Sequence, residues 1–289
     1  MDLVLTAILA NGHVLIEGVP GVAKTLLARL TARLIDADFS RVQFTPDLMP
    51  SDVLGTTVFN MKTNGFDFHQ GPIFADIVLV DEINRAPAKT QAALFEVMEE
   101  RQISIDGTTH RMGNLYTILA TQNPVEQEGT YKLPEAQLDR FLMKITMDYP
   151  SLEEEVNILE RHHTNAALVK LDDITPAITK EELLSLRAFM NQVFVDRTLL
   201  QYIALIVQQT RTSKAVYLGA SPRASVAMLQ SSKAYALLQG RDFVTPEDIK
   251  FVAPYVLQHR LILTAEAEME GYSPVKVTQR LIDKVEVPK

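Results

Sequence analysis

The sequence predicts an α/β protein: a parallel sheet with helices on both faces and two inserted hairpins, followed by an all-helical domain. Three observations predict it. Short apolar runs alternate with helical patterns in the first half, as in βα units around a parallel sheet. Two turn dipeptides, Asn64-Gly65 and Asp106-Gly107, interrupt that alternation. After Pro150 only helical patterns remain. We therefore place the domains at 1–150 and 151–289.

The elements of the first domain follow from apolar periodicity. Continuous apolar runs are typical of strands that are covered on both faces of a sheet. Apolar residues at helical spacing indicate the helices between them. Strands are predicted at 13–16, 41–44, 77–80, 115–120 and 141–147, and helices at 3–10, 24–34 and 88–100.

The two inserted hairpins are predicted within 58–74 and 101–112. Asn-Gly and Asp-Gly between strand-favouring residues are the strongest short hairpin signals, because both central positions need a positive φ.

Helix starts in the second domain are marked by capping residues. Thr179 and Glu182 form a capping-box pattern, and Asp196 is a candidate N-cap. Ser221-Pro222 and Thr245-Pro246 place proline at a first helical position, where its missing N–H is not needed.

The composition excludes several function classes. The 289 residues are 47% hydrophobic and 22% charged, as in a globular protein. The absence of cysteine excludes disulfides and thiolate chemistry. The formal net charge of −8 argues against a nucleic-acid partner. No apolar run approaches the roughly 20 residues that span a bilayer, and we expect a cytoplasmic protein.

A phosphate-binding loop is predicted between the first strand and the first long helix. Main-chain N–H groups of such a loop, and the positive end of the following helix, bind nucleotide phosphates. Lys24 would reach the β- and γ-phosphates, and the Thr25 hydroxyl would bind Mg²⁺. The predicted nucleotide-binding residues are Gly18, Val19, Pro20, Gly21, Val22, Ala23, Lys24, Thr25, Leu26 and, beyond the loop, Asp81.

Ala23 departs from the usual loop pattern, which has glycine before the lysine. A Cβ restricts positive φ values. The loop alone therefore also fits an ordinary strand-to-helix turn with a surface lysine.

An acidic pair, Asp81-Glu82, directly follows the apolar strand at 77–80. Carboxylates at the C-terminal end of a parallel strand point into the crevice where ligands bind. Asp81 would hold Mg²⁺ together with Thr25, and Glu82 would orient and polarise the attacking water. The alternative is a pair of solvated acids at a strand end.

Three further polar residues have two interpretations each. Asn123 would hold the attacking water or the γ-phosphate, or else it opens an Asn-Pro turn. Arg140 would complete a neighbouring subunit's site, or pair with the helix dipole or with Asp139. Arg223 would reach the γ-phosphate from the second domain, or form a surface salt bridge.

The order of these elements resembles that of the AAA+ ATPases, and three longer runs resemble the MoxR family. They begin at Asp81-Glu82-Ile83-Asn84-Arg85, at Ala120-Thr121-Gln122-Asn123-Pro124 and at Leu133-Pro134-Glu135-Ala136-Gln137. The second run continues to Tyr131 and the third to Phe141. Members of this family commonly have alanine before the loop lysine, and the tail from His259-Arg260 also resembles the family.

The resemblance implies an AAA+ core with a helical lid and a Mg²⁺-dependent ATPase that remodels or matures partner protein complexes. It implies that Asn123 is similar to sensor 1, Arg140 to the arginine finger and Arg223 to sensor 2. The hairpins resemble inserts that engage substrate or partner. The family implies a hexameric ring and a partner with a von Willebrand factor A domain.

Family members usually carry a further N-terminal segment with a Val-Gly-Gln stretch near the adenine, so we expect the 1–150 core to be short at its start. That expectation keeps open a nucleotide-gated scaffold with little hydrolysis. A nucleic-acid motor is the third alternative, because related helicases share the hairpin inserts.

Overall fold

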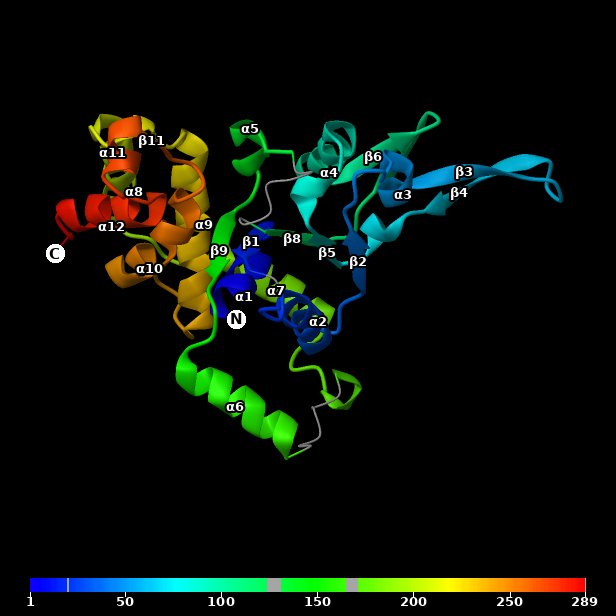
Figure 1. Cartoon of the computed structure of the whole chain (residues 1–289), viewed down its shortest axis with the longest axis horizontal. Coiled ribbons are helices and arrows are strands. Elements are labelled where there is room, and N and C mark those ends of the chain that lie inside the picture. The colour runs from blue at the N-terminus through cyan, green and yellow to red at the C-terminus, as the bar shows by residue number, and fades with distance from the viewer. Residues whose placement is uncertain (20, 124–130, 165–170, 289) are drawn as a thin grey trace. The chain divides into compact units, whose positions relative to one another are not determined.

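The computed structural model describes residues 1–19, 21–123, 131–164 and 171–288 (Figure 1). Contacts divide the chain into two compact units that interleave along the sequence. The helical unit contains residues 1–14, 133–145 and 185–289, and the sheet unit contains residues 15–132 and 146–184. The single boundary predicted near residue 150 stays a prediction.

The predicted sheet is confirmed as a five-stranded sheet with the order β2-β5-β8-β1-β9. Its register is parallel where β5 meets β2 and β8. All five residues of β5 are buried, as expected for a strand covered on both faces. The strands are β1 (Val14–Gly18), β2 (Phe39–Gln43), β5 (Ile77–Asp81), β8 (Thr117–Gln122) and β9 (Met143–Met147).

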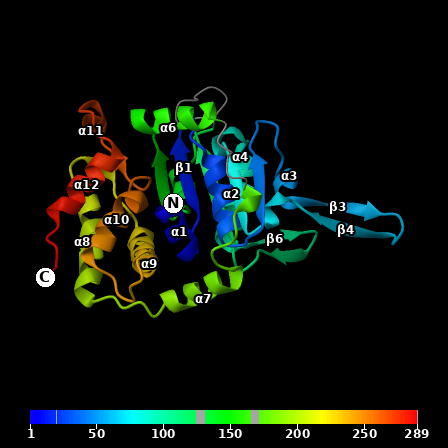
Figure 2. The same cartoon turned by 90° about the horizontal axis from the view of Figure 1, so that it is seen from below.

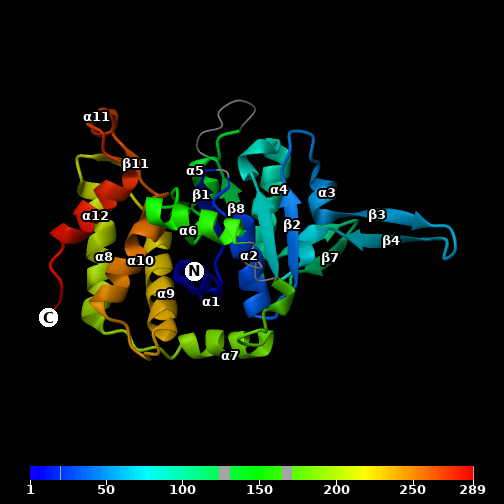
Figure 3. The same ribbon diagram turned by 60° about the horizontal axis from the view of Figure 1, so that its bottom comes forward.

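The helices of the sheet unit follow the predicted periodicity. The helix α2 occupies Lys24–Leu34 and α4 occupies Ala88–Glu100, both as predicted. The amphipathic helix α6 runs past the loop at the start of α2 (Figure 3). The remaining elements are α3 (Pro50–Leu54), α6 (Leu152–His163) and the short 3₁₀ turns η1 (Pro72–Phe74), η2 (Ile83–Arg85) and η3 (Leu171–Asp173).

Both predicted hairpins are confirmed. One pairs β3 (Gly55–Asn60) with β4 (Gly65–Gln70), and the other pairs β6 (Gln102–Ile105) with β7 (Thr108–Arg111). Asp106 and Gly107, which connect the paired residues Ile105 and Thr108, have φ values of 51° and 78°, as a two-residue primed turn requires. The β3–β4 loop is longer than Asn64-Gly65 predicts: Gly65 pairs with Asn60, and Asn64, with a φ of 49°, ends the loop at 61–64. The β3–β4 ribbon extends away from the sheet in all three views (Figures 1, 2 and 3).

The helical unit is built around α8, α9, α10 and α12, which pack side by side, with α1 against α9 (Figure 2). Its described helices are α1 (Asp2–Leu9), α5 (Glu135–Leu138), α8 (Arg197–Thr212), α9 (Pro222–Leu238), α10 (Pro246–Leu257), α11 (Ala265–Met269) and α12 (Pro274–Lys284). The helix α7 (Lys180–Met190) precedes α8 along the chain.

The predicted helix caps in the second half form the expected hydrogen bonds. The Thr179 N–H donates to Glu182 Oε2 at 2.7 Å, and the Glu182 N–H donates to Thr179 Oγ1 at 3.2 Å. The Asp196 side chain accepts the Thr198 N–H at 2.8 Å. These bonds satisfy main-chain donors that a helix start otherwise leaves unpaired.

The purely helical character predicted after Pro150 is wrong in one detail. The strands β10 (Val216–Leu218) and β11 (Ile262–Leu263) pair antiparallel. They have three residues and two residues, too few to show a period of two in the sequence. Within the part of the chain that the structure describes, no helix has the length and apolar character needed to cross a membrane.

Candidate nucleotide site

The loop between β1 and α2 approaches its surroundings closely at one glycine and is open at another. A Cβ on Gly18 would lie 2.7 Å from the Met147 carbonyl oxygen, so only glycine fits there. Gly21 has a φ of 88° and nothing within 4 Å of the Cβ position. Pro20 lies outside the described residues. The loop therefore combines a tight exit from the strand with an open bend.

Ala23, the N-cap of α2, has a φ of 57° and a ψ of 26°. This left-handed conformation is disfavoured by about 1–2 kcal/mol for residues with a Cβ. The sequence argument that alanine restricts positive φ thus identifies a real strain, but the chain adopts this conformation all the same. Strained main chain of this kind is typical of ligand-binding loops.

Lys24 and Thr25 are the first two residues of α2. The Lys24 ammonium donates to the Gly18 carbonyl at 2.7 Å, so its side chain folds back over the loop. Leu26, also predicted to contact nucleotide, is 52% exposed. The loop and the helix start thus present main-chain N–H groups and one ammonium group at the end of β1, a suitable arrangement for phosphate.

Asp81 is the buried last residue of β5. Its Oδ2 accepts from Arg41 Nε at 2.6 Å, and its Oδ1 accepts from Thr121 Oγ1 at 3.1 Å. Arg41 comes from β2 and Thr121 from β8, the two strands that flank β5. The carboxylate is therefore fixed by one donor from each neighbouring strand.

Glu82 follows with a left-handed φ of 56° and caps η2. Its N–H donates to Thr121 Oγ1 at 3.0 Å. Its Oε2 accepts from Gln43 Nε2 and from Arg85 Nε, each at 2.9 Å. A positive φ at a non-glycine residue is an uncommon main-chain conformation. At Glu82 the three polar contacts stabilise this conformation.

Sequence reasoning missed Arg41, Gln43 and Thr121. The feature that brings them to the site is the parallel register, which pairs Gln43 with Asp81 and Val80 with Ala120. This register aligns the ends of the three strands. Nothing in the local sequence specifies that register.

Asn123 is buried and directly follows β8. Because β8 lies between β5 and β1, its end lies between the acidic pair and the phosphate loop. The sheet unit thus brings the loop, Asp81, Glu82 and Asn123 to one edge of the sheet. The segment 124–130 of the Asn123-containing run lies outside the described residues.

A cavity of about 610 Å³ lies beside the loop. It is lined by Gly21, Val22 and Ala23, by residues 147–150, and by Glu154, Asn157 and Ile158 of α6. Its size is in the range of small-molecule sites, which are roughly 300–1,000 Å³.

Arg140 and Arg223 belong to the helical unit. Arg140 follows α5, and its main-chain N–H donates to the Gln137 carbonyl at 3.2 Å. Asp139, the partner considered for Arg140, is paired with Arg260 at 2.6 Å. Arg223 is the second residue of α9, and it is exposed.

Comparisons with known proteins match two parts of the chain to known domains. Residues 13–143 match the ATPase family associated with various cellular activities (AAA), and residues 208–283 match the AAA lid domain. The chain is 44% identical to Chaperone MoxR1 of Mycobacterium tuberculosis, over all of this chain and 78% of that protein. It is 48% identical to the uncharacterized protein YeaC of Bacillus subtilis, over 98% of this chain and 88% of that protein.

A solved structure of a candidate ATPase from Cytophaga hutchinsonii is similar throughout, with a TM-score of 0.90 and 42% identity. The match covers all of this chain and 89% of that one. Three findings agree: the 44% identity to Chaperone MoxR1 over all of this chain, the two matched family regions and the AAA+ fold. This chain belongs to the MoxR family of AAA+ ATPases.

Proposed function

We propose that this protein hydrolyses ATP at the edge of the sheet, with Mg²⁺ as cofactor. The observation that carries the proposal is the position of Asp81 and Glu82, which end β5 while the phosphate loop begins at the end of β1. The cavity beside the loop has room for a nucleotide, and Gly21 leaves the loop open to it. The carboxylate of Asp81 and the hydroxyl of Thr25 are oxygen donors of the kind Mg²⁺ prefers.

Each residue has a distinct role in the proposed reaction. When bound, Mg²⁺ would supply positive charge that neutralises the negative charge developing on the phosphate. Lys24 binds the phosphates, and Thr25 and Asp81 hold the cation. Glu82 accepts a proton from the attacking water, and Asn123 orients that water from the next strand end.

The polar side chains of the proposed site already contact other groups of the protein. Lys24 is bound to Gly18, Asp81 to Arg41, and Glu82 to Gln43 and Arg85. Binding of a nucleotide has to exchange the first two contacts for phosphate and cation. Turnover requires a Glu82 oxygen that can reach the attacking water, and Oε2 already accepts from Gln43 and Arg85.

We further propose that the chain works as a hexameric ring in which Arg140 completes the site of a neighbouring subunit. An arginine supplied in this way increases kcat by a factor of roughly 10³–10⁵ in enzymes where the effect has been measured. In this scheme Arg223 contacts the γ-phosphate as the lid closes. The family membership and the position of Arg140 just before β9 support the scheme.

Steady-state ATP hydrolysis across a wide range of protein concentration tests this proposal. We expect specific activity that rises with concentration and is lost in Arg140→Ala. We expect Glu82→Gln to lower kcat by about 10²–10⁴ while nucleotide affinity is retained. Low activity that is independent of concentration and of Arg140 would instead identify a nucleotide-gated scaffold.

The two hairpins are proposed as the surface that engages a client protein. Val58, Phe59, Met61 and Phe66 of the β3–β4 ribbon are exposed, and the rings of Phe59 and Phe66 lie 5.2 Å apart. A cavity of about 680 Å³ lies between the hairpins, lined in part by Phe66 and Ile105. Exposed apolar side chains gathered on one element mark interaction sites, and the relative named Chaperone MoxR1 supports a chaperone-like role.

The double variant Phe59→Ser/Phe66→Ser tests the client surface. We expect the wild-type protein with ATP to suppress aggregation of a chemically unfolded model protein, and the variant to lose that effect while its basal hydrolysis is unchanged. Tyr217→Ser is the control, because Tyr217 is 79% exposed in the helical unit. An equal loss in both variants would argue against the hairpins. A partner with a von Willebrand factor A domain remains part of the proposal, to be tested by co-purification.

A further inference from the structure

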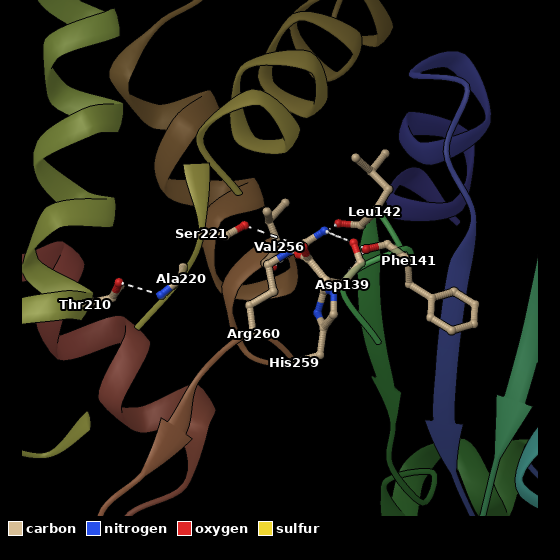
Figure 4. Close-up of polar contacts among 9 residues, drawn as sticks. All are labelled: Asp139, Phe141, Leu142, Thr210, Ala220, Ser221, Val256, His259 and Arg260. Carbon is tan, nitrogen blue, oxygen red and sulfur yellow. Dashed lines mark hydrogen bonds and ion pairs between the residues drawn. The ribbon is translucent and has the colours of Figure 1, made fainter. Parts of the chain in front are cut away.

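Arg260 is a buried charge that the proposed reaction does not use. It follows the end of α10, and its side chain is only 4% exposed. A buried guanidinium is tolerated only where its N–H groups are paired. All five N–H donors have acceptors (Figure 4). Nε donates to Asp139 Oδ1 at 2.6 Å, and the others donate to the carbonyls of Asp139 (3.1 Å), Phe141 (2.7 Å), Leu142 (3.2 Å) and Val256.

Three of those carbonyls belong to Asp139, Phe141 and Leu142, which flank Arg140 in the sequence. The two residues before Arg260 contact the same segment. Gln258 Nε2 donates to the Lys144 carbonyl at 2.5 Å, and His259 Nε2 lies 3.0 Å from the Phe141 carbonyl. Burial lowers the pKa of His259 well below its ordinary value, so the ring is neutral and Nε2 carries the proton that the carbonyl accepts. Three consecutive side chains thus hold the main chain around Arg140.

Asp139 links this segment to the helix that carries Arg223. Its Oδ2 accepts from Ser221 Oγ at 3.5 Å, and Ser221 is the N-cap of α9 (Figure 4). The preceding residue is fixed as well, because the Ala220 N–H donates to Thr210 Oγ1 at 3.0 Å. The start of α9 is therefore held on one side by α8 and on the other by Asp139.

The charges in this cluster are coupled. Burial lowers the pKa of Arg260, and the positive charge of Arg223 lowers it further, while Asp139 acts in the opposite direction. Asp139 thus offsets the electrostatic effect of Arg223 on Arg260.

We propose that Arg260 is a positioning residue for ATP hydrolysis: with Asp139 it joins the main chain around Arg140 and the start of the Arg223 helix into one rigid support. The inference rests on the proposed roles of Arg140 and Arg223. Its consequence is that the two arginines move together and are presented in a fixed relation to each other. Displacement of a reacting group by about 1 Å lowers rates by roughly 10²-fold, so the accuracy of this support affects kcat.

Arg260→Lys tests the proposal, because lysine keeps the charge but has one donor centre where arginine has a planar fork. We expect kcat to fall by roughly 10- to 100-fold, with the Kd of a fluorescent ATP analogue within about twofold of wild type. The matched control is Arg241→Lys. Arg241 donates to both oxygens of Asp248 at 2.8 and 2.5 Å in the same unit, so this variant replaces the planar fork of a comparable ion pair in the same way. We expect it to lower the Tm similarly and leave kcat unchanged.

The double variant Arg140→Ala/Arg260→Lys separates positioning from general damage. If Arg260 acts through Arg140, adding Arg260→Lys to Arg140→Ala should lower kcat much less than it lowers kcat alone. Asp139→Asn and Ser221→Ala, which remove single links of the support, should each lower kcat in the same direction. They decide the question if Arg260→Lys does not fold.

The outcomes distinguish this inference from the proposed function. If Arg140→Ala and Arg223→Ala both hydrolyse ATP normally, the proposed roles of these arginines are wrong and the positioning role is overturned with them. If those variants lose activity but Arg260→Lys and Asp139→Asn lower kcat no more than Arg241→Lys does, only the positioning role is overturned.

Discussion

Arg41 Nε lies 2.6 Å from Asp81 Oδ2, so the carboxylate proposed to hold Mg²⁺ is paired with a cationic side chain of the protein. Arg41 comes from β2 and is about half exposed, whereas Asp81 is buried. The exposed Arg41 side chain can therefore move away from the pair, whereas the buried Asp81 side chain is held in place.

The Arg41–Asp81 pair predicts competition between arginine and Mg²⁺. Because Arg41 is about half exposed, solvent screens the pair, and such pairs are worth roughly 0.2–1 kcal/mol. Arg41→Gln should lower the Mg²⁺ concentration that gives half-maximal hydrolysis by about 1.5- to 5-fold. A Mg²⁺ titration of ATPase activity measures this, with Arg41→Lys as the control that keeps the charge. An unchanged or raised half-saturation concentration would contradict the prediction.

The Thr121 hydroxyl predicts a coupled loss of stability and activity. It donates to Asp81 and accepts from the Glu82 N–H, so Thr121→Val leaves both groups without that partner. We expect the free energy of unfolding to fall by about 1–3 kcal/mol, and kcat to fall because Glu82 loses its main-chain anchor. Urea denaturation and steady-state kinetics measure the two effects. Thr121→Ser keeps the hydroxyl and should behave nearly as wild type; if it is as impaired as the valine variant, the hydrogen bonds of the hydroxyl do not account for the loss.

We expect position 18 not to tolerate a side chain. In Gly18→Ala the new Cβ would lie 2.7 Å from the main-chain oxygen of Met147, and main chain cannot move aside cheaply. We expect a loss of about 1–3 kcal/mol in the free energy of unfolding, together with weaker nucleotide binding. Gly65→Ala is the control, because its nearest neighbour would be 3.7 Å away. Comparable stability of the two variants in chemical denaturation would show that the strand exit is less tight than described.

His259 predicts a pH dependence of stability. Burial lowers its pKa in the folded protein well below the unfolded value of about 6.5. The unfolded chain therefore binds more protons in this window, so this residue's contribution is present above about pH 6.5 and is lost as the pH falls toward the folded pKa. The slope approaches about 1.4 kcal/mol per pH unit.

The His259→Gln variant isolates this contribution. Glutamine keeps an N–H donor for the Phe141 carbonyl but does not titrate. Unfolding measured between pH 7.5 and 5.5 should show a shallower fall in the variant than in wild type. Parallel curves for the two proteins would assign the acid sensitivity to other groups.

The parts of the fold that local patterns specify were predictable. Apolar spacing indicates α2 and α4, and the turn dipeptides mark both hairpins, because each signal is contained within a few residues. The site residues at strand ends were predictable for the same reason: a buried strand followed by acids places those acids at the sheet edge.

The polar network around those acids was not predictable. Arg41, Gln43 and Thr121 reach Asp81 and Glu82 only because distant strands pair in one register, and register is a property of the whole sheet. Arg260 is a similar case. Its segment looked familial in the sequence, but four of its five acceptors belong to residues 139–142, far away in the sequence, and no local pattern identifies them.

The interleaving of the two units has a consequence for how the chain is made. The apolar helix α1 packs against α9, and Arg187 also donates to the Ile8 carbonyl at 2.6 Å. At about 5–20 residues per second, a ribosome takes roughly 10–40 s to proceed from the end of α1 to the start of α9. Through that interval the first helix has been synthesised but its packing partner has not. Burial of α1 against α9 is therefore a late event in the synthesis of the chain, although the two helices belong to one compact unit.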